Sequence, residues 1–298
     1  MTLNNKYDFI LYFTVDKANP NGDPLNGNRP RINYEGLGEV SDVCIKRKIR
    51  NRMIDLGKGV FVQSDEKRVD EFRSLKDRFD SVDDIKIAVK DSNDYEVEKL
   101  ACNRWLDVRS FGQVLAFKAD DKKSGNKGVS IGIRGPVSIH TAVSEEVIDV
   151  TSMQITKSVN SETNKKNPSE KTSDTMGMKH RVDFGVYKLV GSINPQLSEK
   201  TGFSDEDAET LKTCLLTLFE NDASSARPEG SIEVNKLFWF KHNSTSGQYS
   251  AAKMHRCINL EVENPEMYTF ERYGIIENVP EGFAREEKSD VLVEYIGL

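Results

Sequence analysis

The segment from Tyr7 to Val15, YDFILYFTV, restricts the possible folds more than any other part of the chain. Aromatic and β-branched residues dominate it and polar residues bound it, which is typical of a strand buried on at least one face. A chain of 298 residues can bury a substantial core around such a strand. We therefore expect one large domain with insertions, or two small domains.

A loop rich in glycine, proline and asparagine follows this strand over residues 19–30. Its sequence, NPNGDPLNGNRP, favours tight turns and disfavours regular structure. A helix is then expected to begin after Ser41, an N-cap residue, and to run to about Leu56. Gly57 and Gly59 follow directly and would end it.

The expected helix is both amphipathic and basic. One narrow face of its helical wheel carries the apolar residues Ile45, Ile49, Met53 and Leu56. The basic residues of the helix are Lys46, Arg47, Lys48, Arg50 and Arg52. We expect the helix to pack by its apolar face and to present these cations on its other sides. With Arg29 and Arg31 from the preceding loop, they would supply donors for phosphate oxygens.

The net charge of −6 would ordinarily argue against a nucleic-acid partner, but the charge is unevenly distributed. Residues 29–52 are locally basic, and residues 261–298 are acidic. One chain therefore carries a basic surface and an acidic one, as expected of a self-associating or multi-subunit protein.

Highly charged residues between 63 and 103 predict an insertion rather than part of the main core. The apolar residues at helical spacing within it are Val69, Phe72, Leu75 and Phe79. The run Ile85–Val89 predicts a strand. The apolar alternation of Gly132–His140 predicts a second central strand.

Residues 158–174 have almost no apolar side chain, so they cannot offset the entropy that packing would cost them. We therefore expect a mobile projection or loop tip there. The strand-like segment Val147–Thr156 precedes it, and the apolar and basic residues 175–182 follow it. Together the three segments predict a long arm.

The last part of the chain alternates strands with a helix. A strand is expected at residues 184–193, and a helix after Ser204, where Asp207 completes a capping-box pattern. Further strands are expected at Leu237–Phe240 and Ile258–Val262. The order strand, helix, strand, strand, helix, strand, with insertions, is the split βαβ layout of RNA-recognition-type sheets.

The spacing of cysteines and histidines gives no indication of a metal site. The residues are Cys44, Cys102, Cys214, Cys257, His140, His180, His242 and His255. Without a CxxC pair or a histidine at ligand spacing, neither a zinc site nor a disulfide framework is expected, and the thiols should be reduced and mostly buried. Satisfied or exposed imidazoles are likewise expected. No apolar run approaches the ~20 residues that span a bilayer, and Met1–Lys6 lacks a signal-peptide pattern, which predicts a cytoplasmic protein.

A series of motifs resembles the backbone subunit family of type I CRISPR surveillance complexes (Cascade), most of all its subtype I-C branch. In chain order they are Asn19–Pro24, Asn28–Arg31, Ser41–Arg50, Asp107–Gly112, Arg134–Pro136, Thr175–His180, Glu199–Phe203 and Phe240–His242. The resemblance implies an α+β fold, with an RRM-like (ferredoxin-like) palm that makes residues 1–298 a single domain. It also implies a helical insertion (fingers or web) at residues 60–128 and a β-hairpin thumb at residues 147–182.

The function implied by the resemblance is RNA binding without catalysis. Several copies would polymerise head to tail along one CRISPR RNA, beside other Cascade subunits, with no cofactor and no membrane. The thumb of one copy would fold over the RNA held by its neighbour. The guide would then be displayed for pairing with target DNA in antiviral defence, so that RNA reads sequence while protein reads backbone and shape.

The resemblance also implies which residues bind the guide. Those matching its backbone contacts are Arg29, Arg31, Ser41, Lys46, Arg47 and Arg50. Those at the base of the arm, where an apolar side chain could wedge between nucleotides, are Thr175, Met176, Met178, Lys179 and His180. Further candidates are Arg134 and Arg227. Without the resemblance, a basic helix face would be interpreted as solvated surface, and methionines as core residues.

Two other classes of function stay open. Related backbone subunits of other CRISPR types cut target RNA with an aspartate after the first strand, where this chain has Asp16 and Asp23. A metal-dependent ribonuclease would need several converging carboxylates, however, and Asp23 is equally suited to a turn. Asp107 and Arg109 are expected to form a structural pair rather than a site. An acidic scaffold that binds no nucleic acid is the third reading, and it predicts no salt-dependent RNA binding.

Overall fold

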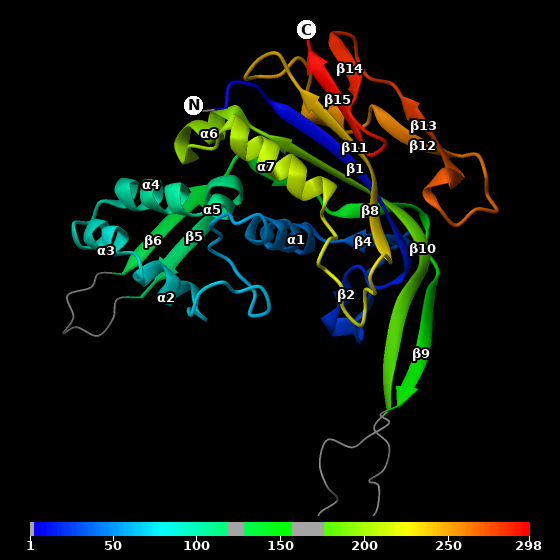
Figure 1. The fold of residues 1–298 in the computed structure, drawn as a ribbon, viewed down its shortest axis with the longest axis horizontal. Helices are drawn as coiled ribbons and strands as arrows, with labels where there is room; N and C mark the ends of the chain where they lie inside the picture. Colours follow the sequence, from blue (N-terminus) through cyan, green and yellow to red (C-terminus); the bar gives the residue numbers. More distant parts are fainter. Residues whose placement is uncertain (1–2, 119–127, 157–175) are drawn as a thin grey trace, which may run out of the picture.

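The computed structural model describes residues 3–118, 128–156 and 176–298 (Figure 1). Its largest layer is a nine-stranded sheet with the strand order β14-β15-β11-β1-β10-β8-β4, in which β7 and β9 also pair with β10. The strands of this sheet are β1 (Tyr7–Ala18), β4 (Leu37–Val40), β7 (Val137–Ile139), β8 (Ala142–Val147), β9 (Val150–Thr156), β10 (Met176–Ile193), β11 (Ile232–Lys241), β14 (Phe283–Glu287) and β15 (Leu292–Gly297). Only β11 and β15 pair in parallel among these strands. The expected α+β class is confirmed.

Strand β1 lies at the centre of the sheet, between β10 and β11, as an apolar strand requires. Phe9 and Phe13 join the main core cluster, whereas Ile10 and Tyr12 join a second cluster on the other face. Both faces of β1 are therefore buried. Trp239 of β11 stacks on Phe9 with ring centroids 5.6 Å apart.

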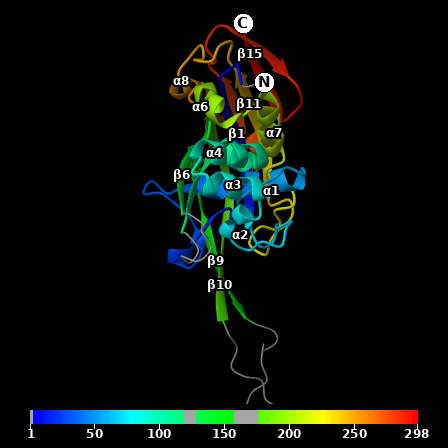
Figure 2. The ribbon, with the colours of Figure 1, turned by 90° about the vertical axis from the view of Figure 1, so that its left-hand side faces the viewer.

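Helices cover the two faces of the sheet (Figure 2). Helices α1 (Asp42–Asp55) and α7 (Asp205–Leu216) pack on the main-core face, and α8 (Ala251–Met254) packs on the opposite face. Helix α7 begins with the predicted capping box, because Ser204 and Asp207 exchange both hydrogen bonds. The short helix α6 (Pro195–Thr201) connects β10 to α7.

Helix α1 has the predicted limits, with Ser41 as N-cap, but its cations are not all presented to solvent. Lys48 is 3% exposed and is ion-paired with Asp222, and Arg52 is 7% exposed. The prediction that the helix shows cations on three sides is therefore wrong. The apolar face also ends earlier than predicted, since Leu56 is exposed.

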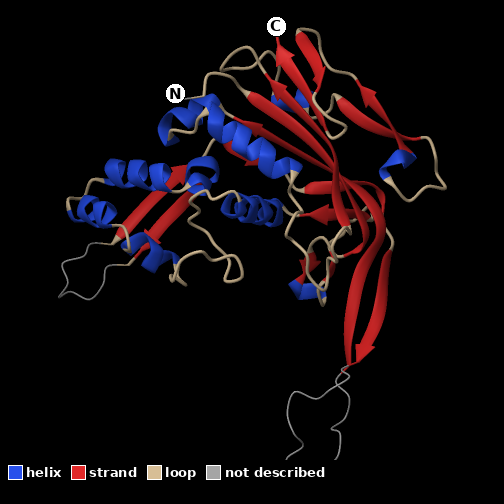
Figure 3. Ribbon diagram, in the orientation of Figure 1, coloured by secondary structure: helices blue, strands red, loops and turns tan. Residues whose placement is uncertain are grey.

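The expected insertion contains four helices and a two-stranded sheet with a core of their own. These elements are α2 (Leu75–Asp80), α3 (Asp83–Lys90), α4 (Asp94–Arg104), α5 (Leu106–Phe111), β5 (Gly112–Phe117) and β6 (Val129–Arg134). The prediction of a strand at Ile85–Val89 is wrong, because this run lies in α3. There Ile85 and Ala88, three residues apart, both face the core. In Figure 3 these helices lie to one side of the large sheet.

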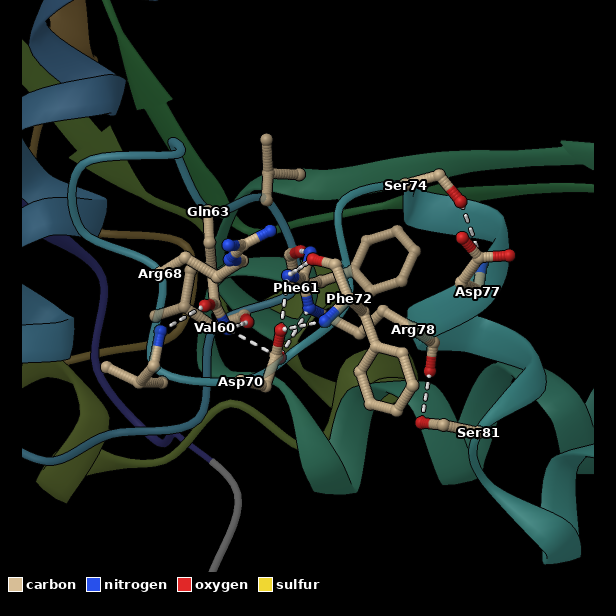
Figure 4. Close-up of polar contacts among 12 residues, drawn as sticks. Val60, Phe61, Gln63, Arg68, Asp70, Phe72, Ser74, Asp77, Arg78 and Ser81 are labelled. Atoms are coloured by element: carbon tan, nitrogen blue, oxygen red, sulfur yellow. Dashed lines mark hydrogen bonds and ion pairs between the residues drawn. The ribbon is translucent and has the colours of Figure 1, made fainter.

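The loop before α2 is not helical, and hydrogen bonds from the buried guanidinium of Arg78 hold it in place (Figure 4). Arg78 forms paired hydrogen bonds of 2.7 Å to both carboxylate oxygens of Asp70, and it also donates to the carbonyl oxygens of Phe61 and Phe72. Val69 is exposed. The predicted helical spacing is therefore wrong at Val69 and Phe72, which lie in this loop.

The prediction of a second central strand at Gly132–His140 is also wrong, because the strand is interrupted at Gly135. Residues up to Arg134 pair with β5 outside the large sheet, and β7 pairs with β10 inside it. The backbone of Gly135 approaches the end of α5 so closely that a Cβ would collide with the carbonyl oxygen of Ser110.

The expected arm begins as a hairpin of β9 and β10, and it projects beyond the rest of the described chain (Figure 1). Strand β10 is 18 residues long, longer than the strand predicted at residues 184–193. It pairs with β1 from Val182 to Ile193 and with β9 from Met176 to Val182. The predicted tip, residues 158–174, lies outside the described residues.

Small hairpins complete the described fold. They are formed by β2 (Gly22–Asp23) with β3 (Arg29–Pro30), and by β12 (Ile258–Val262) with β13 (Tyr273–Glu277). Two 3-10 helices lie beside them, η1 (Pro24–Asn26) and η2 (Phe270–Arg272). Within the described ranges, none of the helices has the length and apolar character needed to cross a membrane.

Candidate nucleic-acid interface

Two of the predicted RNA-binding residues share one pocket. Lys46 of α1 and Arg134 at the end of β6 both line a cavity of about 670 Å³. Lys46 also lies 2.9 Å from Asp42, one turn earlier in the same helix. Arg134 is exposed.

Arg47 and Arg50 are anchored to the start of the insertion. The Nε atom of Arg50 donates to Asp107 over 2.9 Å, and this fully buried carboxylate also accepts from the backbone N–H groups of Phe61 and Val62. Arg47 donates to the carbonyl oxygen of Val62. Burial and the neighbouring Arg50 guanidinium lower the pKa of Arg47. Both side chains therefore have structural partners that RNA would have to share.

The predicted pairing of Asp107 with Arg109 is wrong. Arg109 instead forms two hydrogen bonds of 2.8 Å to Asp207, which completes the capping box of α7 with Ser204. Asp107 and Arg109 thus belong to different contacts. One joins α1 to the insertion, and the other joins the insertion to α7.

A second group of predicted residues lies at the base of the arm. Arg29 donates to the Ser152 hydroxyl over 3.1 Å, and this hydroxyl is 2.8 Å from Nδ1 of His180. The structure thus brings together a residue of the first loop and one of β10. Arg31 lies 3.4 Å from Asp23.

The methionines of the arm are on its surface. Met176 is 66% exposed and Met178 is 55% exposed, so neither fills the core of this chain. Lys179, between His180 and Met178 on β10, is half-buried. Thr175 lies outside the described residues.

Ser41 and Arg227 are engaged in contacts within the fold. The hydroxyl of Ser41 accepts from the backbone N–H of Cys44, and its own N–H donates to Asn21. Arg227 donates to Asp222 over 2.9 Å, the same carboxylate that holds Lys48. The structure therefore places Arg227 beside α1, although it does not line the pocket of Lys46.

The histidines are satisfied or exposed, as expected. His242 is buried, with Nδ1 accepting from the backbone N–H of Gln248 over 2.9 Å and Nε2 lying 2.8 Å from Asp8. Because Nδ1 is an acceptor, Nε2 carries the proton and donates to Asp8. His140 is exposed, and its ring centre is 5.4 Å from that of His255.

Sequence reasoning missed three basic residues that line the pocket of Lys46 and Arg134. They are Lys6, His140 and His255. They come from three separate stretches of the sequence, so no local pattern links them. The pairing of β10 with β1 and β7 brings the segments of Lys6 and His140 together, and contacts with Gly191 and Ser192 of β10 place His255 beside them.

Asp16 and Asp23, the residues of the nuclease alternative, have local contacts. One carboxylate oxygen of Asp23 accepts from the backbone N–H of Leu25, which caps η1. Asp16 lies 3.6 Å from Lys17 and is largely exposed. Over the three described ranges, no group of three or more histidine, cysteine or acidic side chains is placed to hold a metal ion.

Comparison with solved structures finds CRISPR complexes at low sequence identity. A subunit of a "CRISPR RNA-guided surveillance complex, pre-nicking" is 14% identical, with 78% of this chain and 77% of that chain covered and a TM-score of 0.45. A chain of a "CRISPR RNA-guided surveillance complex" is 18% identical, with 78% and 67% covered and a TM-score of 0.41. A chain of the type III-B Cmr-beta complex bound to cognate target RNA is 8% identical, with 78% and 60% covered and a TM-score of 0.41.

Comparison of sequences identifies the family. The chain is 27% identical over 278 residues to the CRISPR-associated protein Cas7 of Haloferax volcanii, covering 89% of this chain and 78% of the relative. Residues 5–277 match the family of the CRISPR-associated protein Cas7. Since this match takes in the large sheet from β1 to β11, the insertion and the described part of the arm, the chain belongs to the Cas7 family.

Proposed function

We propose that this chain binds CRISPR RNA as a repeated, non-catalytic backbone subunit of a type I surveillance complex, of subtype I-C. Cas7 homologues are the RNA-binding backbone subunits of CRISPR surveillance complexes, and membership of that family over residues 5–277 is the observation that carries the proposal. Copies of the chain would bind head to tail along one guide, beside other subunits, in the cytoplasm. The guide would remain free to pair with target DNA.

The proposed architecture is a single RRM-like palm over residues 1–298, with a helical insertion at residues 60–128 and a thumb at residues 147–182. The strand order β11-β1-β10-β8 supports the palm, because a split βαβ sheet has its first strand between its third and fourth. Packing of α1 and α7 on one face of this sheet supports it too. The separate core of the insertion and the projecting β9–β10 hairpin support the other two assignments.

The proposed RNA-binding residues remain those predicted from the sequence. The exposure of Arg134, Met176 and Met178 supports their part in it. Arg29, Arg47 and Arg50 have partners within the chain, so each would bind a phosphate with the donor groups that these partners leave free. A guanidinium has five N–H donors, which makes such sharing feasible.

Lys46 and Lys179 provide the test of RNA binding. Replacing both with glutamine should weaken binding of single-stranded RNA without sequence preference. It should also reduce the slope of log affinity against log salt by about 1.4, since each lost phosphate contact removes about 0.7. Affinity would be measured by fluorescence anisotropy over a series of salt concentrations.

The matched control replaces Lys118 and Lys200, which are exposed, with glutamine. Affinity and slope should then stay closer to those of the unmodified protein. If the two double variants behave alike, the proposed residues are wrong. If the unmodified protein shows no salt-dependent RNA binding, the result would support the alternative hypothesis, an acidic scaffold that binds no nucleic acid.

Absence of cleavage is part of the same proposal. The capping contact of Asp23 and the exposed position of Asp16 support structural or solvated roles for these carboxylates. We expect labelled RNA, bound to the protein and incubated with Mg²⁺, to stay intact on a denaturing gel. Cleavage that Asp23→Ala abolishes, and that the exposed-site control Asp65→Ala leaves unchanged, would establish the ribonuclease alternative.

A further inference from the structure

The pocket that contains Lys46 and Arg134 is formed by segments far apart in the sequence. Lys6 precedes β1, His140 connects β7 to β8, and His255 follows α8. The cavity of about 670 Å³ is large enough to admit part of a polymer chain as well as a small anion. Helices α6 and α8 and strand β6, which contribute to its walls, lie toward the same side of the molecule in Figure 2.

The charge of this pocket is opposite to that of the chain. Two lysines, one arginine and two histidines line it, and none of the lining residues is an aspartate or a glutamate. The whole chain, by contrast, has 48 acidic residues against 42 lysines and arginines. The neutral lining residues with polar side chains are Ser138, Ser192, Asn194, Gln196, Thr245 and Ser246. A wall of cations, hydroxyls and amides is suited to phosphate oxygens.

The basic groups of the pocket differ in how firmly they are held. Lys6 donates to the carbonyl oxygen of Tyr249 over 3.0 Å and lies 2.9 Å from the buried Asp8, which fixes its position. Lys46 is held by Asp42. The side chain of Arg134 makes no hydrogen bond or ion pair with any residue in the ranges that the structure describes, and it is exposed, so its guanidinium is available to a ligand.

His255 is oriented from behind the pocket. Its Nε2 atom lies 3.0 Å from the carbonyl oxygen of Gly191 and 3.1 Å from the hydroxyl of Ser192, with Asp8 at 3.6 Å. Contact with a carbonyl oxygen means that Nε2 carries the proton. A second proton would therefore bind at Nδ1.

Protonation of His255 is opposed in the free chain. Burial lowers the pKa of His255. Asp8 and the carbonyl oxygen of Gly191 oppose this effect, whereas His140 and Lys6 reinforce it. A bound anion would favour the protonated form of both imidazoles. The charged and titratable groups around the two rings are Lys6, Asp8, Lys46 and Arg134.

We infer that this pocket binds a phosphate group of a nucleic-acid backbone, and that it does so more tightly when His140 and His255 are protonated. The inference rests on the proposed function in one respect, that the phosphodiester belongs to the guide RNA. It adds Lys6, His140 and His255 to the interface, together with a dependence on pH.

The test measures RNA affinity of the full chain at about pH 6 and about pH 8, at fixed ionic strength, since histidine changes charge in this interval. The unmodified protein should bind about threefold more tightly at the lower pH, as expected of one partly exposed charge pair. His140→Asn should remove most of this difference. Arg134→Gln should weaken binding at both pH values and reduce the salt slope by about 0.7.

Arg73→Gln is the matched control, because Arg73 is exposed and does not line the pocket. If Arg134→Gln and His140→Asn both match this control while the unmodified protein binds RNA, the inference is overturned and the proposed function stands. His140 is exposed, so its replacement leaves the core intact.

A titration with inorganic phosphate tests the pocket independently of the proposed RNA binding. The imidazole NMR signals of His140 and His255 would be followed while phosphate alone, and then single-stranded RNA, is added. Shifts with phosphate in a protein that binds no RNA would support the pocket and overturn the proposed function. Shifts with RNA alone would identify the phosphodiester as the ligand, and no shift with either would overturn the pocket.

Discussion

Replacing Asp107 with alanine should lower the free energy of unfolding by about 3–5 kcal/mol, the usual cost of breaking a buried ion pair by removing one partner. Asp107 is fully buried, and its carboxylate accepts from Arg50, Phe61 and Val62. The change would leave the largely buried Arg50 guanidinium without its charge partner and two backbone N–H groups without an acceptor. Urea denaturation followed by circular dichroism would measure the loss.

Asp16→Ala is the control for Asp107, since Asp16 is largely exposed and only 3.6 Å from an exposed lysine. An exposed pair of this kind contributes up to about 1 kcal/mol. Equal losses in the two variants would contradict the role assigned to Asp107. Because Arg50 is a predicted RNA contact, the Asp107 variant should be compared by stability rather than by RNA binding.

Replacing Asp8 with asparagine should lower the free energy of unfolding by about 3 kcal/mol near neutral pH. Asp8 is fully buried and accepts from His242 over 2.8 Å, from Ser192 over 2.5 Å and from Lys6. An amide presents donors of its own to these three donors. Thermal or urea unfolding would measure the loss, and the exposed Asp65→Asn is the control.

The effect of Asp8→Asn should also depend on pH. Burial raises the pKa of Asp8, but hydrogen bonds from His242, Ser192 and Lys6 outweigh burial and hold the pKa below its usual value. The ionised carboxylate therefore stabilises the fold above the unfolded-state pKa of about 3.9, and this contribution is lost as pH falls through the lower folded-state pKa. The difference between the two proteins should accordingly shrink below about pH 4. A difference that stays constant down to that range would contradict the assignment.

Elements with local signals were predictable from the sequence. The strand β1 follows from its apolar run, the start of α1 from the N-cap Ser41, and the start of α7 from its capping box. In each case the deciding residues lie within a few positions of one another. Their physical effect is therefore visible in a short window of sequence.

The errors arose where distant residues decide the structure. Lys48 is buried because Asp222, more than 160 positions away, neutralises it. Arg52 pairs with the distant Glu220 as well as with Asp55 of its own helix. The β-branched run Ile85–Val89 is helical because its apolar residues complete the separate core of the insertion, which outweighs a weak strand preference.

The candidate site shows the same limit. Lys46 and Arg134 were selected through the family resemblance, and the structure places both in one pocket. Lys6, His140 and His255 complete its basic lining, yet no spacing in the sequence connects them. Arg29 and His180 likewise meet only through Ser152.

The 18-residue length of β10 has a mechanical consequence. At ~3.3 Å per residue, the strand is a continuous rod of roughly 60 Å. The part of this strand from Val182 to Ile193 is held by hydrogen bonds to β1 on one side and to β7 and β8 on the other, and the part before Val182 extends as the base of the arm. Moving the part before Val182 would require bending the paired part of β10 or breaking its hydrogen bonds, so the folding of the sheet also sets the direction in which the arm projects.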